Sequence, residues 1–143
     1  VLGWFGLRIG CICVERGKRT QAIKSMVAAV NSGNSPAGQL IIYPQGTRIA
    51  PGASAPYKIG TAVLYQETGQ TCIPAATNVG VFWPKYGILR QPGLAVIEFL
   101  PAIQPGLSNE LFMHRLEEVI EQSSNALLEE AATDGFYPVG QDT

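Results

Sequence analysis

The sequence predicts an α/β domain in which a mostly parallel sheet is flanked by helices and followed by a long C-terminal amphipathic helix. The 143 residues suffice for one domain with a sizeable core. Short apolar runs alternate with segments of helical periodicity, which is typical of a parallel sheet covered on both faces. Apolar residues then recur at helical spacing between Leu111 and Leu128, which predicts the final helix.

The first half of the chain is expected to form a strand, a helix and a second strand. Residues 9–14 (IGCICV) are apolar and long enough for a buried strand. Thr20 can cap a helix that ends before Gly33. A second buried strand is expected at residues 40–43 (LIIY), ahead of a loop rich in proline, glycine, serine and alanine.

The second half is expected to add two helices and two strands. A helix should run from about Lys58 to Thr68, where Gly69 ends it, and strands are expected at residues 71–76 and 94–100. Ser108 should begin the long helix. Its apolar stripe consists of Leu111, Phe112, Leu116, Val119, Ile120, Leu127 and Leu128. We expect one domain at residues 1–132, incomplete at its N-terminus, and a flexible tail at residues 133–143.

The charges are segregated along the chain. Residues 1–90 contain nine lysines and arginines against two acids, a balance of +7. Residues 91–143 contain one arginine against nine acids, a balance of −8. This pattern favours an anionic partner for the first part, such as a phosphate, a nucleotide, a nucleic acid or a lipid surface. The alternative is an acidic solvated helix together with scattered surface lysines.

Several chemistries are not supported by the residues present. The chain has three cysteines without a CxxC pair and a single histidine, His114, so a zinc site or a disulfide framework is not expected. A Walker loop, a GxSxG elbow and a GxGxxG loop are all absent from the sequence. No apolar run reaches the roughly 18 residues that a membrane span requires.

Two basic segments follow the first two predicted strands, VERGKR at 14–19 and YPQGTR at 43–48. Neighbouring parallel strands would bring Arg16 and Arg48 together, each with donors suited to phosphate. Gly46 permits a close backbone approach, the Thr47 hydroxyl can donate, and Lys58 stands at the start of the next predicted helix. The alternative is an ordinary turn between strand and helix with solvated arginines.

These segments together resemble the lysophosphatidic acid acyltransferase (1-acyl-sn-glycerol-3-phosphate O-acyltransferase) family, whose four blocks are HxxxxD, a hydrophobic segment ending in acid-Arg, FPEGTR, and an apolar segment with V/I-Pro. GCICVER at 10–16 resembles the second block, YPQGTR at 43–48 the third, and CIPAA at 72–76 the fourth. Residues 57–60 (YKIG) resemble the FKxG that often follows the third block. The blocks occur in the family's order, and the resemblance covers about residues 5–130.

The sequence departs from the family pattern at two places. Gln45 stands where the family usually has glutamate, which keeps the shape but removes the charge. The HxxxxD block is absent, because the fifth residue after His114 is Val119. In the family this block precedes the acid-Arg segment. We therefore expect the chain to be the C-terminal portion of an acyltransferase, without the catalytic base.

The resemblance implies a fold like that of glycerol-phosphate acyltransferases and transfer of an acyl group to the free hydroxyl of a lysophosphatidate, giving phosphatidate. It implies acyl-CoA or acyl carrier protein as co-substrate, with no metal and no organic cofactor. The residues implied to hold the substrate phosphate are Arg16, Gln45, Gly46, Thr47, Arg48 and Lys58, and those implied to line an apolar acyl pocket are Ile73 and Pro74.

The resemblance also implies a membrane surface as partner and no nucleic acid. The expected location is the cytoplasmic face of a bacterial inner membrane, reached peripherally or through a preceding anchor. Three alternatives stay open: a non-catalytic phosphate- or phospholipid-binding module, an acyltransferase acting on another lysolipid or an acylated amine, and a nucleotide- or nucleic-acid-binding α/β domain.

Overall fold

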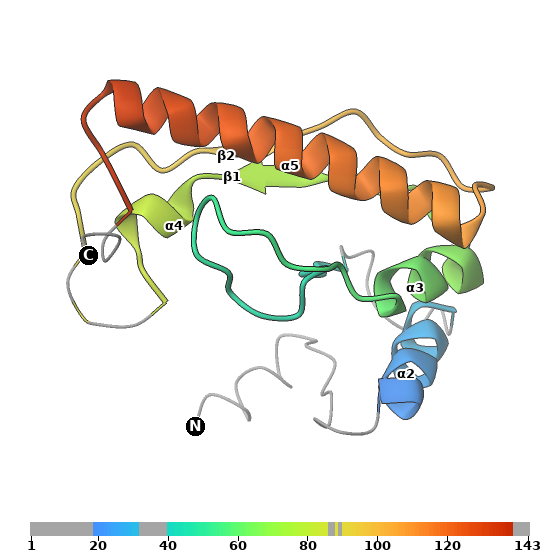
Figure 1. Ribbon diagram of the computed structural model, residues 1–143. Coiled ribbons are helices and arrows are strands. Elements are labelled where there is room, and N and C mark those ends of the chain that lie inside the picture. Colours follow the sequence, from blue (N-terminus) through green and yellow to red (C-terminus); the bar gives the residue numbers. More distant parts are fainter. Residues whose placement is uncertain (1–18, 32–39, 86–87, 89, 139–143) are drawn as a thin grey trace.

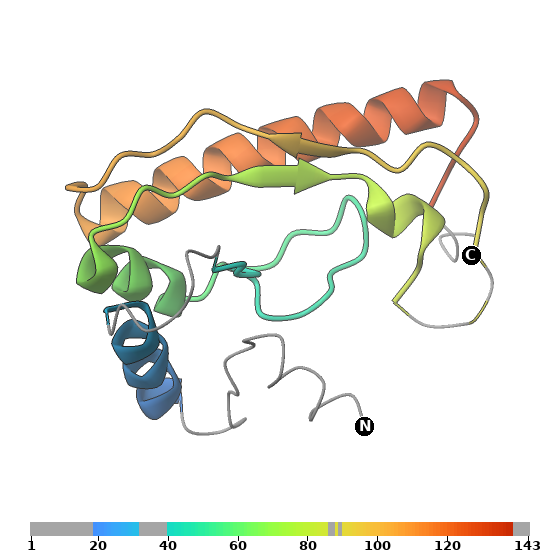
Figure 2. The ribbon, with the colours of Figure 1, turned by 180° about the vertical axis from the view of Figure 1, so that it is seen from behind.

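The computed structural model describes residues 19–31, 40–85, 88 and 90–138 (Figure 1). Its elements, in chain order, are helix α2 (Arg19–Asn31), helix α3 (Gly60–Thr68), strand β1 (Ala75–Thr77), helix α4 (Val79–Phe82), strand β2 (Ile97–Phe99) and helix α5 (Asn109–Thr133). Helix α5 lies along one face of the β1–β2 pair, and the view from behind shows the other face of that pair (Figures 1 and 2). The predicted α/β class and the long C-terminal helix are therefore confirmed.

The described sheet has two strands, and they are antiparallel. Ala75 pairs with Phe99, Ala76 with Glu98, and Thr77 with Ile97. An isolated antiparallel bridge between Cys72 and Ile103 extends the pairing. The chain thus reverses its direction between β1 and β2, whereas a mostly parallel sheet was expected. The mostly parallel sheet is thus not confirmed in the part of the chain that the structure describes.

The core forms where α5 covers the sheet and α3. Tyr65 of α3 stacks on Phe112 of α5, with ring centroids 3.9 Å apart, and Phe112 is fully buried. Further along α5, Leu127 packs with Ala76 of β1 and with Leu100, the residue that follows β2. Near the C-terminal end of α5, Ala131 packs with Val81 and Phe82 of α4. These contacts fix α3, α4 and the sheet against one helix.

The local signals at helix ends are mostly confirmed. Gly69 follows α3 with φ 58°, the left-handed conformation that glycine tolerates best. Ser108 precedes α5, and its hydroxyl accepts a hydrogen bond from the Leu111 backbone N–H at 3.3 Å. Two details are wrong. Helix α2 already begins at Arg19, so Thr20 lies inside the helix. Leu111, expected in the apolar stripe, is 62% exposed.

The expected buried strand at residues 40–43 is also wrong. These residues form no strand in the structure, and Ile41 and Tyr43 are 75% and 79% exposed. A strand requires a neighbour for its backbone N–H and C=O groups, and none of the other described segments pairs with this one. The first expected strand, residues 9–14, lies outside the described part.

The segment after α5 returns to the core. The Phe136 backbone N–H donates to the Ala131 carbonyl at 2.8 Å. The Phe136 ring meets the Phe82 ring edge to face, with centroids 5.4 Å apart. The tail was predicted at residues 133–143, and Thr133 is the last residue of α5. Within this tail, Phe136 packs against Phe82 of α4. Among the described residues, no helix combines the length and the apolar character that crossing a bilayer requires.

Candidate functional site

The YPQGTR stretch forms a tight turn, as its glycine indicates. The Gly46 backbone N–H donates to the Tyr43 carbonyl at 2.9 Å. Gly46 has φ 70°, a left-handed conformation that is strained for residues with a side chain. Gln45 is half-buried, whereas Thr47 and Arg48 are exposed. The turn therefore presents a glycine in the left-handed conformation, a hydroxyl and a guanidinium to solvent.

Lys58 lies against this turn. Its backbone N–H donates to the Pro44 carbonyl at 2.7 Å, which closes the long loop between the turn and α3. A Cβ placed on Gly46 would lie 3.7 Å from the Lys58 Cγ, which is ordinary van der Waals contact. The side chain of Lys58 is exposed. The structure thus brings Gly46 and Lys58 together, although 12 positions separate them in the chain.

A second lysine reaches the turn from a segment that sequence reasoning missed. Lys85 Nζ lies 3.5 Å from Thr47 Oγ1, at the limit of a hydrogen bond. In the sequence, Lys85 is one of nine positive charges in residues 1–90 and belongs to no motif. The basic balance of that part of the chain was the only signal that could have indicated it.

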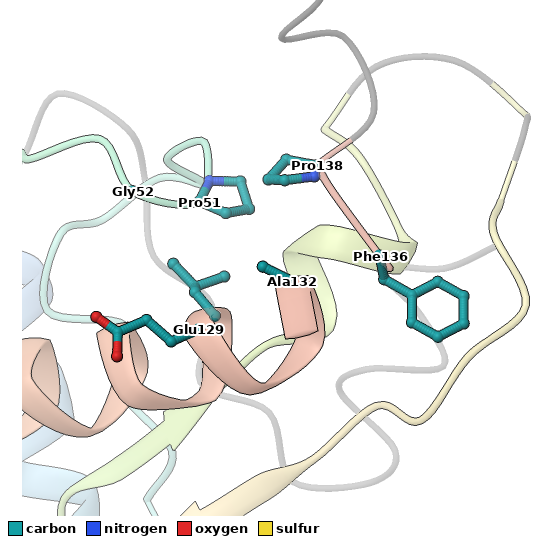
Figure 3. A pocket seen from close by; sticks show the side chains of 7 residues that line it. Pro51, Gly52, Glu129, Ala132, Phe136 and Pro138 are labelled. Atoms are coloured by element: carbon teal, nitrogen blue, oxygen red, sulfur yellow. The ribbon is translucent and has the colours of Figure 1, made fainter. Parts of the chain in front are cut away.

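The loop that leaves the turn packs on α4 and α5. The Pro51 ring approaches Gly80 of α4 so closely that a Cβ on Gly80 would lie 2.9 Å from the Pro51 Cγ. Pro51 also borders a cavity of about 350 Å³ at the end of α5 (Figure 3). The residues lining this cavity are Pro51, Gly52, Leu128, Glu129, Ala132, Phe136 and Pro138. The turn is thereby anchored to two helices.

Tyr57 anchors the other end of the loop. Its hydroxyl donates to the Glu121 carboxylate of α5 at 2.9 Å. Burial raises the pKa of the Tyr57 phenol, and the hydrogen bond to Glu121 raises it further. The phenol therefore stays protonated near neutral pH and acts as a structural donor. Tyr57, Ile59, Asn109, Glu110 and Met113 border a second cavity of about 350 Å³.

Neither Cys72 nor His114 forms part of the turn's contacts. Burial raises the pKa of the Cys72 thiol, so this half-buried side chain stays protonated. His114, the one histidine in the sequence, is exposed on α5. No three histidine, cysteine or acidic side chains among the described residues are grouped as a metal site would require.

The remaining predicted site residues are Arg16, Ile73 and Pro74. Arg16 lies outside the described residues. Ile73 is 60% exposed, whereas the neighbouring Pro74 is buried and its carbonyl accepts from the Leu100 N–H at 2.9 Å. Successive residues of an extended chain point to opposite faces. The structure therefore places Ile73 and Pro74 on different sides, and an acyl pocket formed by both stays a prediction.

Comparison with known proteins connects this turn to a family. The family model described as "Acyltransferase" matches residues 1–78, which is 78 of the 143 residues. The chain belongs to the acyltransferase family. All residues predicted to hold substrate, from Arg16 to Pro74, fall within the matched region, whereas Lys85 lies beyond it.

Two curated relatives support the same assignment. The chain is 28% identical over 101 residues to a 1-acyl-sn-glycerol-3-phosphate acyltransferase of Pseudomonas aeruginosa, covering 71% of this chain and 39% of that protein. It is 24% identical over 146 residues to the enzyme of the same name from Saccharomyces cerevisiae, covering 99% of this chain and 47% of that protein. The chain thus spans less than half of the length of these relatives. No solved structure matches it. The resemblance to the lysophosphatidic acid acyltransferase family is confirmed.

Proposed function

We propose that this chain holds the phosphate of a lysophosphatidate for acyl transfer from acyl-CoA or acyl carrier protein, which yields phosphatidate for phospholipid biosynthesis. This proposal rests on the turn at Gly46, on which Lys58 packs and beside which Thr47 and Arg48 are exposed. The names of the two relatives support the substrate class. Cationic side chains and a hydroxyl at a glycine turn suit a phosphate group chemically.

In the proposed reaction the free hydroxyl oxygen of the lysophosphatidate attacks the thioester carbonyl carbon of the acyl donor. A C–O ester bond forms, the C–S bond breaks, and the departing sulfur takes up the proton that the hydroxyl loses. The residues of the turn contribute by holding the phosphate, which fixes the position of the hydroxyl. Neither a metal nor an organic cofactor has a role in this proposal.

A general base must accept the hydroxyl proton during attack. The HxxxxD pair that supplies it in the resembled family does not occur in these 143 residues. We therefore propose that the 143 residues on their own bind lysophosphatidate weakly and turn over negligibly. We also propose that Arg16, whose segment precedes YPQGTR in the chain, adds a second guanidinium to this phosphate site.

We further propose that the site works at the cytoplasmic surface of a membrane. Ile41, Tyr43 and Ile59 are each more than 60% exposed, and in the sequence they flank Arg48 and Lys58. Exposed apolar and aromatic side chains next to cations suit the boundary between acyl chains and anionic head groups. The same arrangement leaves the lipid substrate within reach of the turn.

The proposal is tested by the binding of lysophosphatidate to the 143-residue chain. Arg48→Ala should weaken binding roughly 10- to 150-fold, because charge-assisted hydrogen bonds contribute roughly 1.5–3 kcal/mol. The matched control is Arg115→Ala, which removes one positive charge from an exposed pair with Glu118 on α5. Displacement of lysophosphatidate by an oligonucleotide would contradict the proposal and favour a nucleic-acid partner.

A non-catalytic phospholipid-binding module is a second candidate. Gln45 in place of the family's glutamate favours it, because the residue keeps only part of the hydrogen-bonding capacity of the carboxylate. Acyl transfer by a longer chain that carries an HxxxxD pair together with these 143 residues would exclude this candidate. Binding without transfer in such a chain would support it.

A further inference from the structure

Lys85 meets the substrate turn from a different part of the fold. Its Nζ lies 3.5 Å from Thr47 Oγ1, although 38 positions separate the two residues. Lys85 is the third residue after the end of α4 and lies outside the region that the family model matches. Both side chains are exposed, so a ligand can reach them.

The segment that carries Lys85 is held at its base. The Gln91 backbone N–H donates to the Phe82 carbonyl at 3.1 Å, which ties the two ends of the segment together. The guanidinium of Arg90 lies over the Trp83 ring, 4.2 Å from its centroid. Lys85 therefore lies three residues after a helix end that this backbone hydrogen bond holds.

The base of this segment is in turn docked on the loop that leaves the turn. Gly80 of α4 and Pro51 are in such close contact that a Cβ at Gly80 would require the proline ring to move. This second contact between α4 and the loop is independent of the contact between Lys85 and Thr47. The two contacts together place a third cation beside Thr47, in addition to Arg48 and Lys58.

The Lys85 ammonium group also lies where the Thr47 hydroxyl oxygen can accept from it, at 3.5 Å. When the Thr47 oxygen accepts from an ammonium group, its own hydrogen is left to donate to a ligand oxygen. A phosphate oxygen at the turn can then receive a hydroxyl hydrogen bond and lie near the ammonium group. Such coupled hydrogen bonds strengthen one another.

We propose that Lys85 is a positioning residue that selects lysolipids with a phosphomonoester head group over those with a phosphodiester. A phosphomonoester carries a charge of about −1.5 to −2 at pH 7, because its second pKa is about 6. A phosphodiester carries a single negative charge at the same pH. An added cation therefore stabilises the monoester more than the diester. The inference rests on the proposed function and names the group that decides the substrate class.

The test uses the 143-residue chain and phosphatidylcholine vesicles that contain lysophosphatidate, a monoester, or lysophosphatidylglycerol, a diester. Lys85→Met should weaken binding to the lysophosphatidate vesicles about fivefold, the upper end for an exposed ion pair, and to the diester vesicles about twofold. Lys85→Arg keeps the charge and should restore most of the preference. Arg115→Met removes the same charge elsewhere and should leave both affinities unchanged. Circular dichroism verifies that each variant is folded.

A second readout separates a head-group contact from a structural role. At pH 5 both lysolipids carry close to one negative charge, so the preference of the unsubstituted chain should largely disappear and Lys85→Met should affect both vesicles alike. A preference that persists unchanged at pH 5 would overturn the inference.

The outcomes distinguish this inference from the proposed function. If the unsubstituted chain binds neither kind of vesicle above plain phosphatidylcholine, the proposed function fails. If it binds lysophosphatidate and Arg48→Ala weakens that binding while Lys85→Met does not, the function stands and the role of Lys85 is refuted. If Lys85→Met weakens binding to both lysolipids equally at pH 7, Lys85 does not select the head group.

Discussion

Gly46 and Gly52 provide a matched pair for testing whether the YPQGTR turn binds the substrate. Both glycines lie in the same loop with positive φ, 70° and 77°. A Cβ at Gly46 would make only ordinary contact with Lys58 at 3.7 Å, and a Cβ at Gly52 would have no neighbour within 4 Å. The cost of either Gly→Ala change is therefore conformational, about 1–2 kcal/mol for a left-handed residue.

The two variants should differ in binding although they share this cost. If Gly46→Ala opens the turn, the ligand must restore the turn conformation when it binds. This costs about 1–2 kcal/mol and weakens lysophosphatidate binding roughly 5- to 30-fold. Gly52→Ala lies beyond the turn and should leave binding unchanged. Gly46→Asn should lie between Gly46→Ala and the unsubstituted chain, because asparagine tolerates the left-handed conformation better than alanine.

Urea unfolding and vesicle binding, measured on the same samples, separate the two effects. Equal losses of unfolding free energy with a loss of binding only in Gly46→Ala would support a phosphate site at the turn. Equal losses of binding in both variants would show that binding depends on the loop as a whole. Unchanged binding in Gly46→Ala would refute the turn as the binding element.

Three further substitutions test the packing that holds the site. Phe112→Ala should lower the unfolding free energy by about 3–5 kcal/mol, whereas Leu111→Ala, at an exposed neighbouring position, should lower it by less than about 1 kcal/mol in urea denaturation. The pKa of Tyr57 is higher in the folded chain than the ordinary value of 10, so its contribution to stability is complete below pH 10 and falls as pH rises above it. Tyr57→Phe should reduce the loss of thermal stability between pH 10 and 11, and an unchanged loss would contradict this. Asn78→Ala should lower the unfolding free energy by about 1–3 kcal/mol, because the buried Asn78 side chain accepts from the Val96 N–H at 2.7 Å. A change below about 0.5 kcal/mol, which is typical of a surface substitution, would contradict this.

Local signals explain why parts of the fold could be predicted. Gly69 and Ser108 act on the hydrogen bonds of the adjacent helix turn, so their effect depends on few other residues. The α5 stripe follows from helical spacing, although the same pattern could not separate buried Phe112 from exposed Leu111. That difference depends on where Tyr65 of α3 meets the helix, which is a tertiary contact.

Tertiary pairing explains why the sheet could not be predicted. The apolar composition of residues 40–43 indicates a preference for burial, but it does not identify a partner strand. The direction of β2 depends on the return of the chain after β1, where Asn78 bonds the Val96 backbone. Nothing in the sequence indicates that Asn78 is buried or that it bonds the backbone of Val96.

The candidate site shows the same division between local and tertiary information. The motif residues determine the turn, because Gly46 supplies its conformation and Thr47 and Arg48 follow directly in the chain. The position of Lys85 depends on α4, and α4 approaches the loop only because Gly80 has no side chain to displace Pro51. A chain with the same YPQGTR stretch and an alanine at position 80 would therefore keep the turn and lose the placement of its third cation. Head-group preference in this family should accordingly follow residues that lie outside the motif.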